Sequence, residues 1–269
     1  MNMILLSPWD LAWGALLVVA LAAATLGTGV RLGKSILGAG LRTLLQLSLV
    51  GYVVGFIFRQ SQLHWVVLIS LVMLLAAAKE VKDRQKRPFA GFWGFGLSLG
   101  TLTISSYLIA LYSLLGILQP TPWFSPQYAI PLLGMLLGNS MSGISLGLDK
   151  LTSLAADQRL LIETRLSLGH SSSEALSSIK AEALRTGLTP IINTMAAAGL
   201  VSLPGMMTGQ ILAGGDPLEA AKYQILIIFL IVAGTGFGIL FALALAGRRL
   251  FDERMRLRLD RLQPVRPKA

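Results

Sequence analysis

Long apolar runs separated by short, polar and mostly basic connections dominate the pattern of this chain. Several runs approach the roughly 20 residues that a helix needs to cross the hydrocarbon layer of a bilayer. They predict about seven membrane-spanning helices: Trp9–Thr28, Leu41–Phe58, Leu63–Ala78, Phe92–Leu118, Tyr128–Leu148, Leu188–Ala213 and Lys222–Ala246. The pattern therefore predicts an all-α, polytopic membrane protein in which residues 1–269 form a single transmembrane domain.

The composition supports the same class of protein. Hydrophobic residues make up 54% of the 269 positions and charged residues only 13%, too few to cover a soluble core of this size. Cysteine is absent, so the chain offers neither disulfides nor thiolate metal ligands. The first apolar run follows no basic leader, and we expect it to be retained as a span of a multi-pass protein. The bacterial plasma (inner) membrane is the expected location, with a photosynthetic organelle as the alternative.

The basic residues predict the orientation. With the amino terminus outside and the carboxyl terminus in the cytoplasm, every Lys and Arg except Arg59 and Lys222 lies on the inner side. The formal charge of +10 is spread over the connections instead of forming one patch, which indicates topology and not a nucleic-acid partner. The basic tail at 247–269 is expected to lie in the cytoplasm against anionic headgroups of the lipid bilayer.

The sixth predicted span is interrupted. Pro204 lacks a backbone donor and Gly205 tolerates non-helical backbone angles, so this pair predicts a helix break between half-helices at Pro190–Ser202 and Met206–Ala213. Discontinuous helices frame transport sites in many carriers. The sequence leaves the depth of the break open, either near the bilayer centre or at the outer surface. Glycines at four-residue spacing, such as Gly143 with Gly147, predict close helix packing elsewhere.

Uncharged polar and thioether side chains gather near this break and on the span before it. Amide oxygens and methionine sulfurs would bind a passing metal ion weakly, which suits a pathway. The alternative is structural, because methionine also fills gaps and amides join helices. The metal ligands themselves stay unknown, and the candidate pathway residues are Asn139, Met141, Met206, Met207 and Gln210.

One long polar connection, 149–187, separates the fifth and sixth spans. Asp157–Leu168 reads as a short helix, Gly169 suits its end, and Ser171 with Glu174 forms a capping box that starts a second helix. The connection is either a plain solvated loop or a compact two-helix knob that a cytoplasmic partner can bind.

Several stretches of the chain carry a family resemblance. The spacing from Glu163 to Gly169 is similar to the first half of the coupling loop of ABC permeases, although Thr189-Pro190 stands where that motif has its Ile-x-Leu-Pro ending. In order along the chain, further matching stretches are Arg42–Gln46 with Val50–Val53, Ile130–Met135 with Gly138–Met141, Leu166–Gly169, Gly199–Met207, Ala213-Gly214, Asp216-Pro217 and Tyr223-Gln224. Together they resemble the FetB/YbbM family of ABC permeases.

The resemblance implies a transmembrane subunit that is not an enzyme by itself and holds no cofactor. It implies a homodimer of the permease, joined by a cytoplasmic ATPase of the FetA type. It further implies ATP-driven export of a metal ion such as iron, while plant relatives are associated with aluminium tolerance. The residues expected to couple to the ATPase are Glu163, Arg165, Leu168 and Gly169. The chain's own Gly27–Ser35 ends in Gly-Lys-Ser but has Thr28 where a phosphate-binding loop needs its first glycine.

Other functions stay open. A passive channel or secondary carrier is disfavoured because no Asp, Glu or His lies well inside a predicted span, where proton-coupled carriers place a relay. A membrane scaffold that recruits a cytoplasmic partner is a second alternative. A membrane-embedded enzyme ranks last, because no base or metal site is visible in the spans.

Overall fold

The computed structural model describes residues 7–26 and 32–264, and these are almost entirely helical. Six of the segments it describes are long and apolar enough to cross a membrane. They belong to α1 (Pro8–Leu26), α2 (Gly33–Gln60), α3 (Leu63–Arg84), the composite segment Trp93–Leu118, α6 (Pro126–Asp157) and α11 (Pro217–Arg249). The shorter described helices are α7 (Arg159–Ser167), α8 (Ser172–Ala175), α9 (Ser177–Ala197), α10 (Gly205–Leu212) and the 3-10 turn η3 (Leu259–Arg261). The predicted all-α, multi-pass membrane protein is confirmed.

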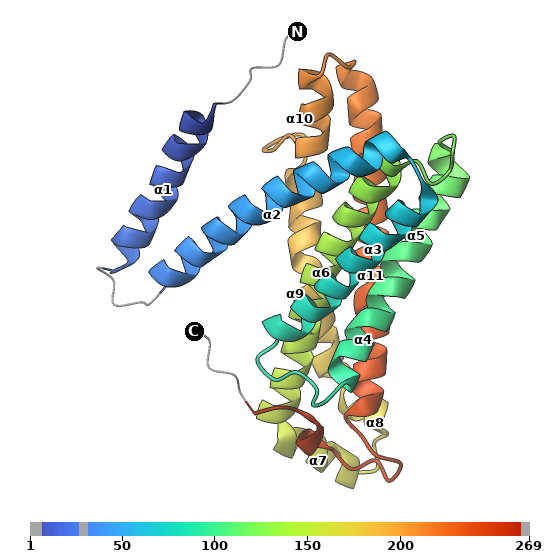
Figure 1. Ribbon diagram of the computed structural model, residues 1–269. Coiled ribbons are helices and arrows are strands. Elements are labelled where there is room, and N and C mark those ends of the chain that lie inside the picture. Colours follow the sequence, from blue (N-terminus) through green and yellow to red (C-terminus); the bar gives the residue numbers. More distant parts are fainter. Residues whose placement is uncertain (1–6, 27–31, 265–269) are drawn as a thin grey trace.

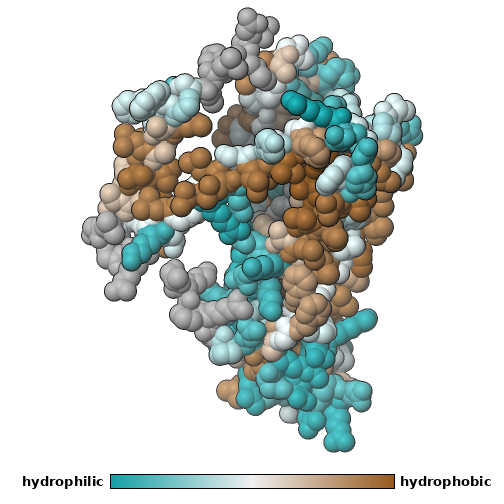
Figure 2. Space-filling model, viewed as in Figure 1, coloured by the Kyte–Doolittle hydropathy of each residue, from teal (hydrophilic) through white to brown (hydrophobic). Residues whose placement is uncertain are grey.

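Helix α6 is the centre of the bundle. It packs against α3, α9 and α11 (Figure 1). Helices α7 and α8 lie at one end of the bundle with the segment that follows α11, and α10 lies at the other. We call these the α7 end and the α10 end. Helices α1 and α2 form a hairpin that leans away from the bundle, and nearly all of their side chains are exposed. Figure 2 shows hydrophobic residues along the bundle and the hairpin, and a concentration of hydrophilic residues at the α7 end.

Glycines set how closely the central helices approach. A Cβ atom on Gly187 of α9 would stand 2.9 Å from the backbone oxygen of Gly143 on α6, and one on Gly143 would stand 2.7 Å from Cγ2 of Thr235 on α11. Neither position has room for a side chain. The packing role predicted for Gly143 is therefore confirmed, because close backbone approach replaces the hydrophobic drive in lipid.

The fourth predicted span is not a uniform α-helix. Helices α4 (Trp93–Leu102) and α5 (Leu108–Tyr112) alternate with two π-helical stretches, Thr103–Tyr107 and Ser113–Leu118. The hydroxyl groups of Ser105 and Ser106 are buried there and lack hydrogen-bond partners among the described residues. Single π-helical turns within helices are frequent at functional sites, but periodicity alone predicted one continuous helix here.

The interrupted sixth span differs from its predicted boundaries. Helix α9 starts at Ser177, continues through Pro190 and ends at Ala197, five residues before the predicted end at Ser202. The backbone turns earlier because Gly199 takes a left-handed φ of +83° and its N–H donates to the Ser202 oxygen at 2.9 Å. Pro204 then stands as the N-cap of α10, which begins at Gly205 as predicted near this pair.

The break lies toward the α10 end of the molecule. Helix α10 has eight residues and rises about 12 Å, so the break stands that far from the turn that leads into α11. The 33 residues of α11 extend about 50 Å. Leu200 and Val201 at the break are 91% and 85% exposed. Of the two depths that the sequence left open, the geometry favours the one nearer the end of the bundle.

We expect Gly187→Ala to lower the free energy of unfolding by roughly 1–3 kcal/mol, because its methyl group would meet the Gly143 backbone oxygen and force α6 and α9 apart. Gly138→Ala on α6 is the matched control, since nothing lies within 4 Å of a Cβ atom there. Thermal unfolding in detergent, followed by circular dichroism, measures both variants. Equal midpoints of thermal unfolding for the two variants would show that the contact between Gly143 and Gly187 does not limit how closely α6 and α9 pack.

Candidate functional site

The knob, which we define as α7, the elbow 168–171 and α8, has a rigid base. Ile162 of α7, Ala175 of α8 and the following Leu176 are fully buried in the same core cluster as the ends of α6 and α11. Helix α6 runs on to Asp157 and α9 starts at Ser177, so both central helices extend further into 149–187 than expected. Helix α7 is the first of the two predicted short helices. The second, predicted to start at the capping box and to continue through Leu176 and Leu184, is instead divided into the four-residue α8 and the beginning of α9, which meet at Leu176.

The elbow of the knob forms as its residue types require. Gly169 takes a left-handed φ of +90°, which a residue with a side chain rarely adopts. Ser171 and Glu174 make the predicted capping box: the Glu174 amide donates to the Ser171 hydroxyl at 3.3 Å, and the Ser171 amide donates to the Glu174 carboxylate at 2.7 Å. Hydrogen bonds from the Ser171 hydroxyl and amide lower the pKa of Glu174. The elbow is therefore preformed.

The four predicted coupling residues divide into internal and external roles. Arg165 Nη1 donates to the Ala175 oxygen at 3.2 Å and to Ser178 Oγ at 3.0 Å, so this arginine ties α7 to α8 and α9. Glu163 pairs with Arg159 one turn earlier on α7, at 2.7 Å. Leu168, in contrast, is 74% exposed at the end of α7.

A second apolar side chain accompanies Leu168. Leu160, at the start of α7, is 79% exposed, and no sequence pattern singles it out. Leu160 and Leu168 give the knob two exposed apolar side chains on a rigid base, at an otherwise hydrophilic end of the molecule.

The segment after α11 is folded. We call residues 250–264 the tail. Asp252 organises its first turn by accepting hydrogen bonds from the amides of Arg254 and Arg256 at 3.0 and 2.9 Å, and from Arg256 Nε at 2.9 Å. Arg258 makes a two-bond pair with Asp260, at 2.8 and 2.9 Å.

Backbone hydrogen bonds fasten the tail to the loop between α3 and α4. Ala90 N–H donates to the Arg261 oxygen at 2.8 Å, and Gln263 N–H donates to the Pro88 oxygen at 2.8 Å. Phe89 is 2% exposed and pairs with Leu262 in an isolated β-bridge. The described part of the predicted basic anchor is thus built into the protein. Residues 265–269 lie outside the described part of the chain.

The tail and the knob share a surface at the α7 end. A pocket of about 890 Å³ lies between them, with Glu163 and His170 on the knob side and Met255 and Arg256 on the tail side. Met255 is 53% exposed and has a left-handed φ of +55°. A partner that covers Leu168 would meet the tail as well.

The predicted pathway residues do not form one compact cluster. Asn139 is exposed on α6 and its amide donates to the Met135 oxygen of its own helix at 2.9 Å. Met141 packs against the core cluster of the α7 end and Met206 against that of the α10 end. Met207 and Gln210 are half-buried on α10, and Oε1 of Gln210 has no hydrogen-bond partner among the described residues. Their role as a pathway stays a prediction.

A strip of polar residues, which the sequence did not reveal as a unit, follows α6 from Asn139 through Ser142 to Lys150. We call it the polar strip. Helix α3 forms one side, where Arg84 Nη1 donates to Ser142 Oγ at 3.4 Å. Helix α9 forms the other side, where Lys150 pairs with Glu182 at 3.6 Å. In Figure 2, hydrophilic residues continue from the α7 end toward α2.

The α3 side and the α9 side of the polar strip carry different chemistry. On α3, Glu80 pairs with Arg84 at 3.1 Å and with Arg42 of α2 at 3.8 Å. On α9, the exposed polar positions Arg185, Thr189 and Asn193 recur at the spacing of one helix face. The i, i+4 spacing of Glu80 and Arg84 is the available sequence signal, but a third span that ends at Ala78, as predicted, leaves both residues in a loop.

Comparison with known proteins places this architecture in a family. A family model described as "Uncharacterised protein family (UPF0014)" matches residues 8–251. The chain belongs to the UPF0014 family. No solved structure matches it.

Three named relatives match between 71% and 94% of the chain. A UPF0014 membrane protein of Synechocystis is 40% identical over 252 residues, which are 92% of this chain and 95% of the relative. The "Probable iron export permease protein FetB" of Escherichia coli is 30% identical over 255 residues, 94% of this chain and 96% of the relative. The "Protein ALUMINUM SENSITIVE 3" of Arabidopsis thaliana is 35% identical over 192 residues, 71% of this chain and 68% of the relative. The resemblance stated from the sequence motifs is confirmed.

We expect the tail of this UPF0014 protein to stay folded from neutral pH down to about pH 4 and to loosen toward pH 2. Hydrogen bonds from Arg256 and Arg258 lower the pKa of Asp252 and that of Asp260 below the usual 3.8, the latter to about 2. A carboxylate with a lowered pKa stabilises the fold above its unfolded pKa, and the contribution is lost as pH falls through the folded pKa. Amide hydrogen exchange at residues 254–258, corrected for intrinsic rates, measures this.

Asp252→Asn provides the control for that pH profile and should raise exchange in the tail already at neutral pH. Asp157→Asn removes an exposed carboxylate that accepts no backbone amide in the described structure, and it should leave tail exchange unchanged. Tail protection that is insensitive to both pH and Asp252→Asn would contradict the assigned role of this carboxylate.

Proposed function

We propose that this chain is the permease subunit of an ATP-driven ABC transporter that exports a metal ion such as iron. The polar strip is the observation that supports transport. Exposed amide and hydroxyl groups on a membrane helix are unfavourable against lipid, so they are expected to line a water-filled path or to be covered by protein. The polar strip carries such groups on α6 and α9 and continues to the α7 end.

A homodimer would cover the polar strip. In the single chain Asn139, Thr189 and Asn193 are exposed on α6 and α9. A second copy placed across these helices would enclose the strip as a route, and a two-fold arrangement is the common form of homo-oligomers. The predicted pathway residues Met206, Met207 and Gln210 would then contribute at the α10 end.

The α7 end is assigned to the cytoplasm in this proposal. It carries Arg159, Arg165 and the arginines of the tail, and basic residues gather on the cytoplasmic side of membrane proteins. The knob would dock on a FetA-like ATPase through Leu168 and Leu160. Its rigid base, latched by Arg165 and shaped by Gly169, would pass movement of the ATPase to α6 and α9, which the knob joins directly.

The assignment of iron rests on the name of the relative in Escherichia coli. Among the described residues there is no group of three or more His, Cys, Asp or Glu that could hold a metal ion. A passing ion would instead meet amide oxygens, hydroxyls and thioethers, which bind weakly and release readily. The Arabidopsis relative is named for aluminium. We therefore propose a metal ion as the class of cargo, and iron as the specific candidate within it.

The main test is reconstitution with a FetA-type ATPase. We expect the complex in sealed vesicles to move Fe²⁺ only with ATP. Leu168→Ser should reduce co-purification and ATP-driven flux by roughly tenfold or more, because it removes an exposed apolar anchor worth about 1.5–3 kcal/mol without disturbing the core. Leu218→Ser, at a leucine of the α10 end that is 64% exposed, is the matched control.

The other outcomes select among the alternatives. If a stable complex hydrolyses ATP but moves no Fe²⁺, the chain is still assigned as a permease, and iron is rejected as its cargo. Flux without ATP would favour a passive channel or secondary carrier. A stable complex that moves no ion tested and shows no stimulated hydrolysis would favour the scaffold.

The proposed dimer is tested by cross-linking, for which the cysteine-free chain is well suited. We expect single-cysteine variants Asn139→Cys and Asn193→Cys to form covalent dimers in membranes on addition of a short thiol cross-linker, because both side chains would face the second copy. Phe237→Cys, 63% exposed on α11, is expected to stay monomeric. If only the Phe237→Cys variant forms covalent dimers, the interface lies on α11 and not across α6 and α9, and the proposed dimer is wrong.

A further inference from the structure

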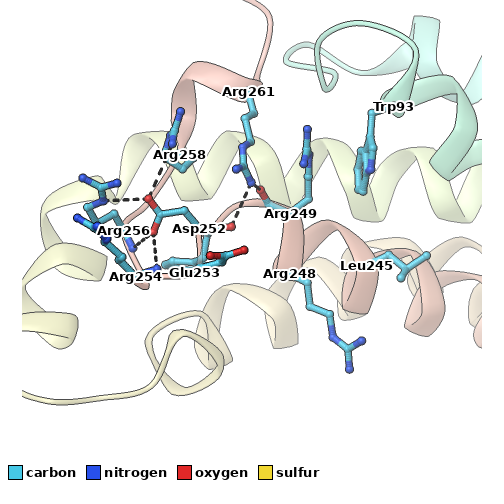
Figure 3. Close-up of a pocket in the computed structure, with 11 residues that line it drawn as sticks. Trp93, Leu245, Arg248, Arg249, Asp252, Glu253, Arg254, Arg256, Arg258 and Arg261 are labelled. Carbon is cyan, nitrogen blue, oxygen red and sulfur yellow. Dashed lines mark hydrogen bonds and ion pairs between the residues drawn. The ribbon is translucent and has the colours of Figure 1, made fainter.

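A basic pocket lies where α4 begins and α11 ends. Its volume is about 600 Å³. Trp93, the first residue of α4, and Leu245 of α11 form its apolar side (Figure 3). Its polar side holds six arginines: Arg248, Arg249, Arg254, Arg256, Arg258 and Arg261. The carboxylates of Asp252 and Glu253 also line it, so the pocket carries a clear excess of positive charge.

Half of these arginines are committed to holding the walls together. Arg256 and Arg258 pair with Asp252, at 2.9 and 3.8 Å. Arg261 Nη1 donates to the backbone oxygens of Arg249 and Phe251, at 2.8 and 3.1 Å. The tail is thereby fixed as one wall of the pocket (Figure 3).

The other three arginines have no ion-pair partner among the described residues. Arg249 is half-buried, with its guanidinium 5.3 Å from the centre of the Trp93 ring. Its Nε is buried and without a hydrogen-bond partner in the described structure. In the described structure Arg254 makes a hydrogen bond through its backbone amide alone. Arg248 also lines the pocket, but its guanidinium points away from that of Arg249 in Figure 3. Burial of Lys180, and secondly the charge of Arg248, lower the pKa of Lys180.

The position of the pocket selects its ligand. Trp93 and Arg249 are terminal residues of two segments that are long and apolar enough to span the membrane, and they meet at the α7 end. Tryptophan and arginine at that depth lie at the level of lipid headgroups. The guanidinium group binds phosphate through two parallel N–H bonds, and a partly buried, unpaired Arg249 leaves those donors available.

We propose that this pocket binds a phosphate anion, and that the anion is the headgroup of a phospholipid in the leaflet at the α7 end. The phosphate would bind the guanidinium of Arg249, with Arg254 as a second unpaired cation of the same pocket. The acyl chains of the lipid would leave along Trp93 and Leu245 into the bilayer. Basic pockets between spans on the cytoplasmic side bind anionic headgroups in the same manner. This inference does not depend on the cargo, on the dimer or on the ATPase.

The site is tested with the full-length protein purified in mild detergent. Native mass spectrometry counts phosphatidylglycerol and phosphatidylcholine retained by the wild type and by Arg249→Gln, Arg254→Gln and Arg185→Gln. Arg254→Gln serves as the second pocket variant because it touches no buried group. Arg185→Gln is the matched control, since it removes the same charge from an exposed site on α9 that does not line the pocket.

We expect each pocket variant to retain roughly tenfold less phosphatidylglycerol than the wild type, the effect of one lost charge-assisted hydrogen bond. Arg185→Gln should retain the wild-type amount. Equal retention of phosphatidylglycerol by all variants would show that the pocket does not bind this lipid.

In a second experiment, inorganic phosphate is titrated into protein held in a neutral detergent, with the melting temperature as the readout. If phosphate raises the melting temperature in a way that depends on Arg249, and phosphatidylglycerol is not selectively retained, the pocket binds a soluble phosphate compound and not a phospholipid.

Discussion

The contact of α6 with α9 and α11 at Gly143 and Gly187 is the constraint on which the rest of this structure depends. The backbones of α6 and α9 meet there with no side chain between them, and Thr235 and Ile239 of α11 pack against the two glycines, so the three helices have fixed relative heights. That fixed height sets α7 and α8 beyond the end of the bundle, because α6 and α9 both continue past the contact into the polar segment. It also brings Lys150 opposite Glu182 and leaves one face of α6 open between α3 and α9.

The α7 end is one assembly of several chain segments. Arg165 joins the knob to α9, the bridge of Phe89 with Leu262 joins the tail to the α3–α4 loop, and Arg261 joins the tail to the last turn of α11. Exposed Leu160 and Leu168 extend from this base. In the proposed transporter, a force applied to the knob would therefore reach α6, α9 and α11 together and would not be absorbed by a flexible loop.

Much of the candidate site could be predicted because its signals are local. Gly169 and the capping box of Ser171 with Glu174 are short-range patterns with one physical solution, and both formed as expected. The coupling residues could not be ranked, since Arg165 looked as free as Leu168 until its carbonyl and hydroxyl partners from α8 and α9 were in place. The polar strip was not predicted for a similar reason. Its members come from α3, α6 and α9, and no periodicity within one segment relates Arg84 to Ser142.

The sequence by itself determined that the chain is a helical, multi-pass membrane protein of this family, because apolar run length and the motifs around Gly199–Met207 need no knowledge of neighbours. Only the tertiary structure decided where the regular helix stops. Gly199 and not Pro204 ends α9, since the bond to Ser202 stabilises the earlier turn, and Pro190 is carried within the helix. It also decided that the basic tail folds on Asp252 and closes a pocket against Trp93. Hydrogen bonds between residues more than a hundred positions apart fix that arrangement, and composition alone cannot specify them.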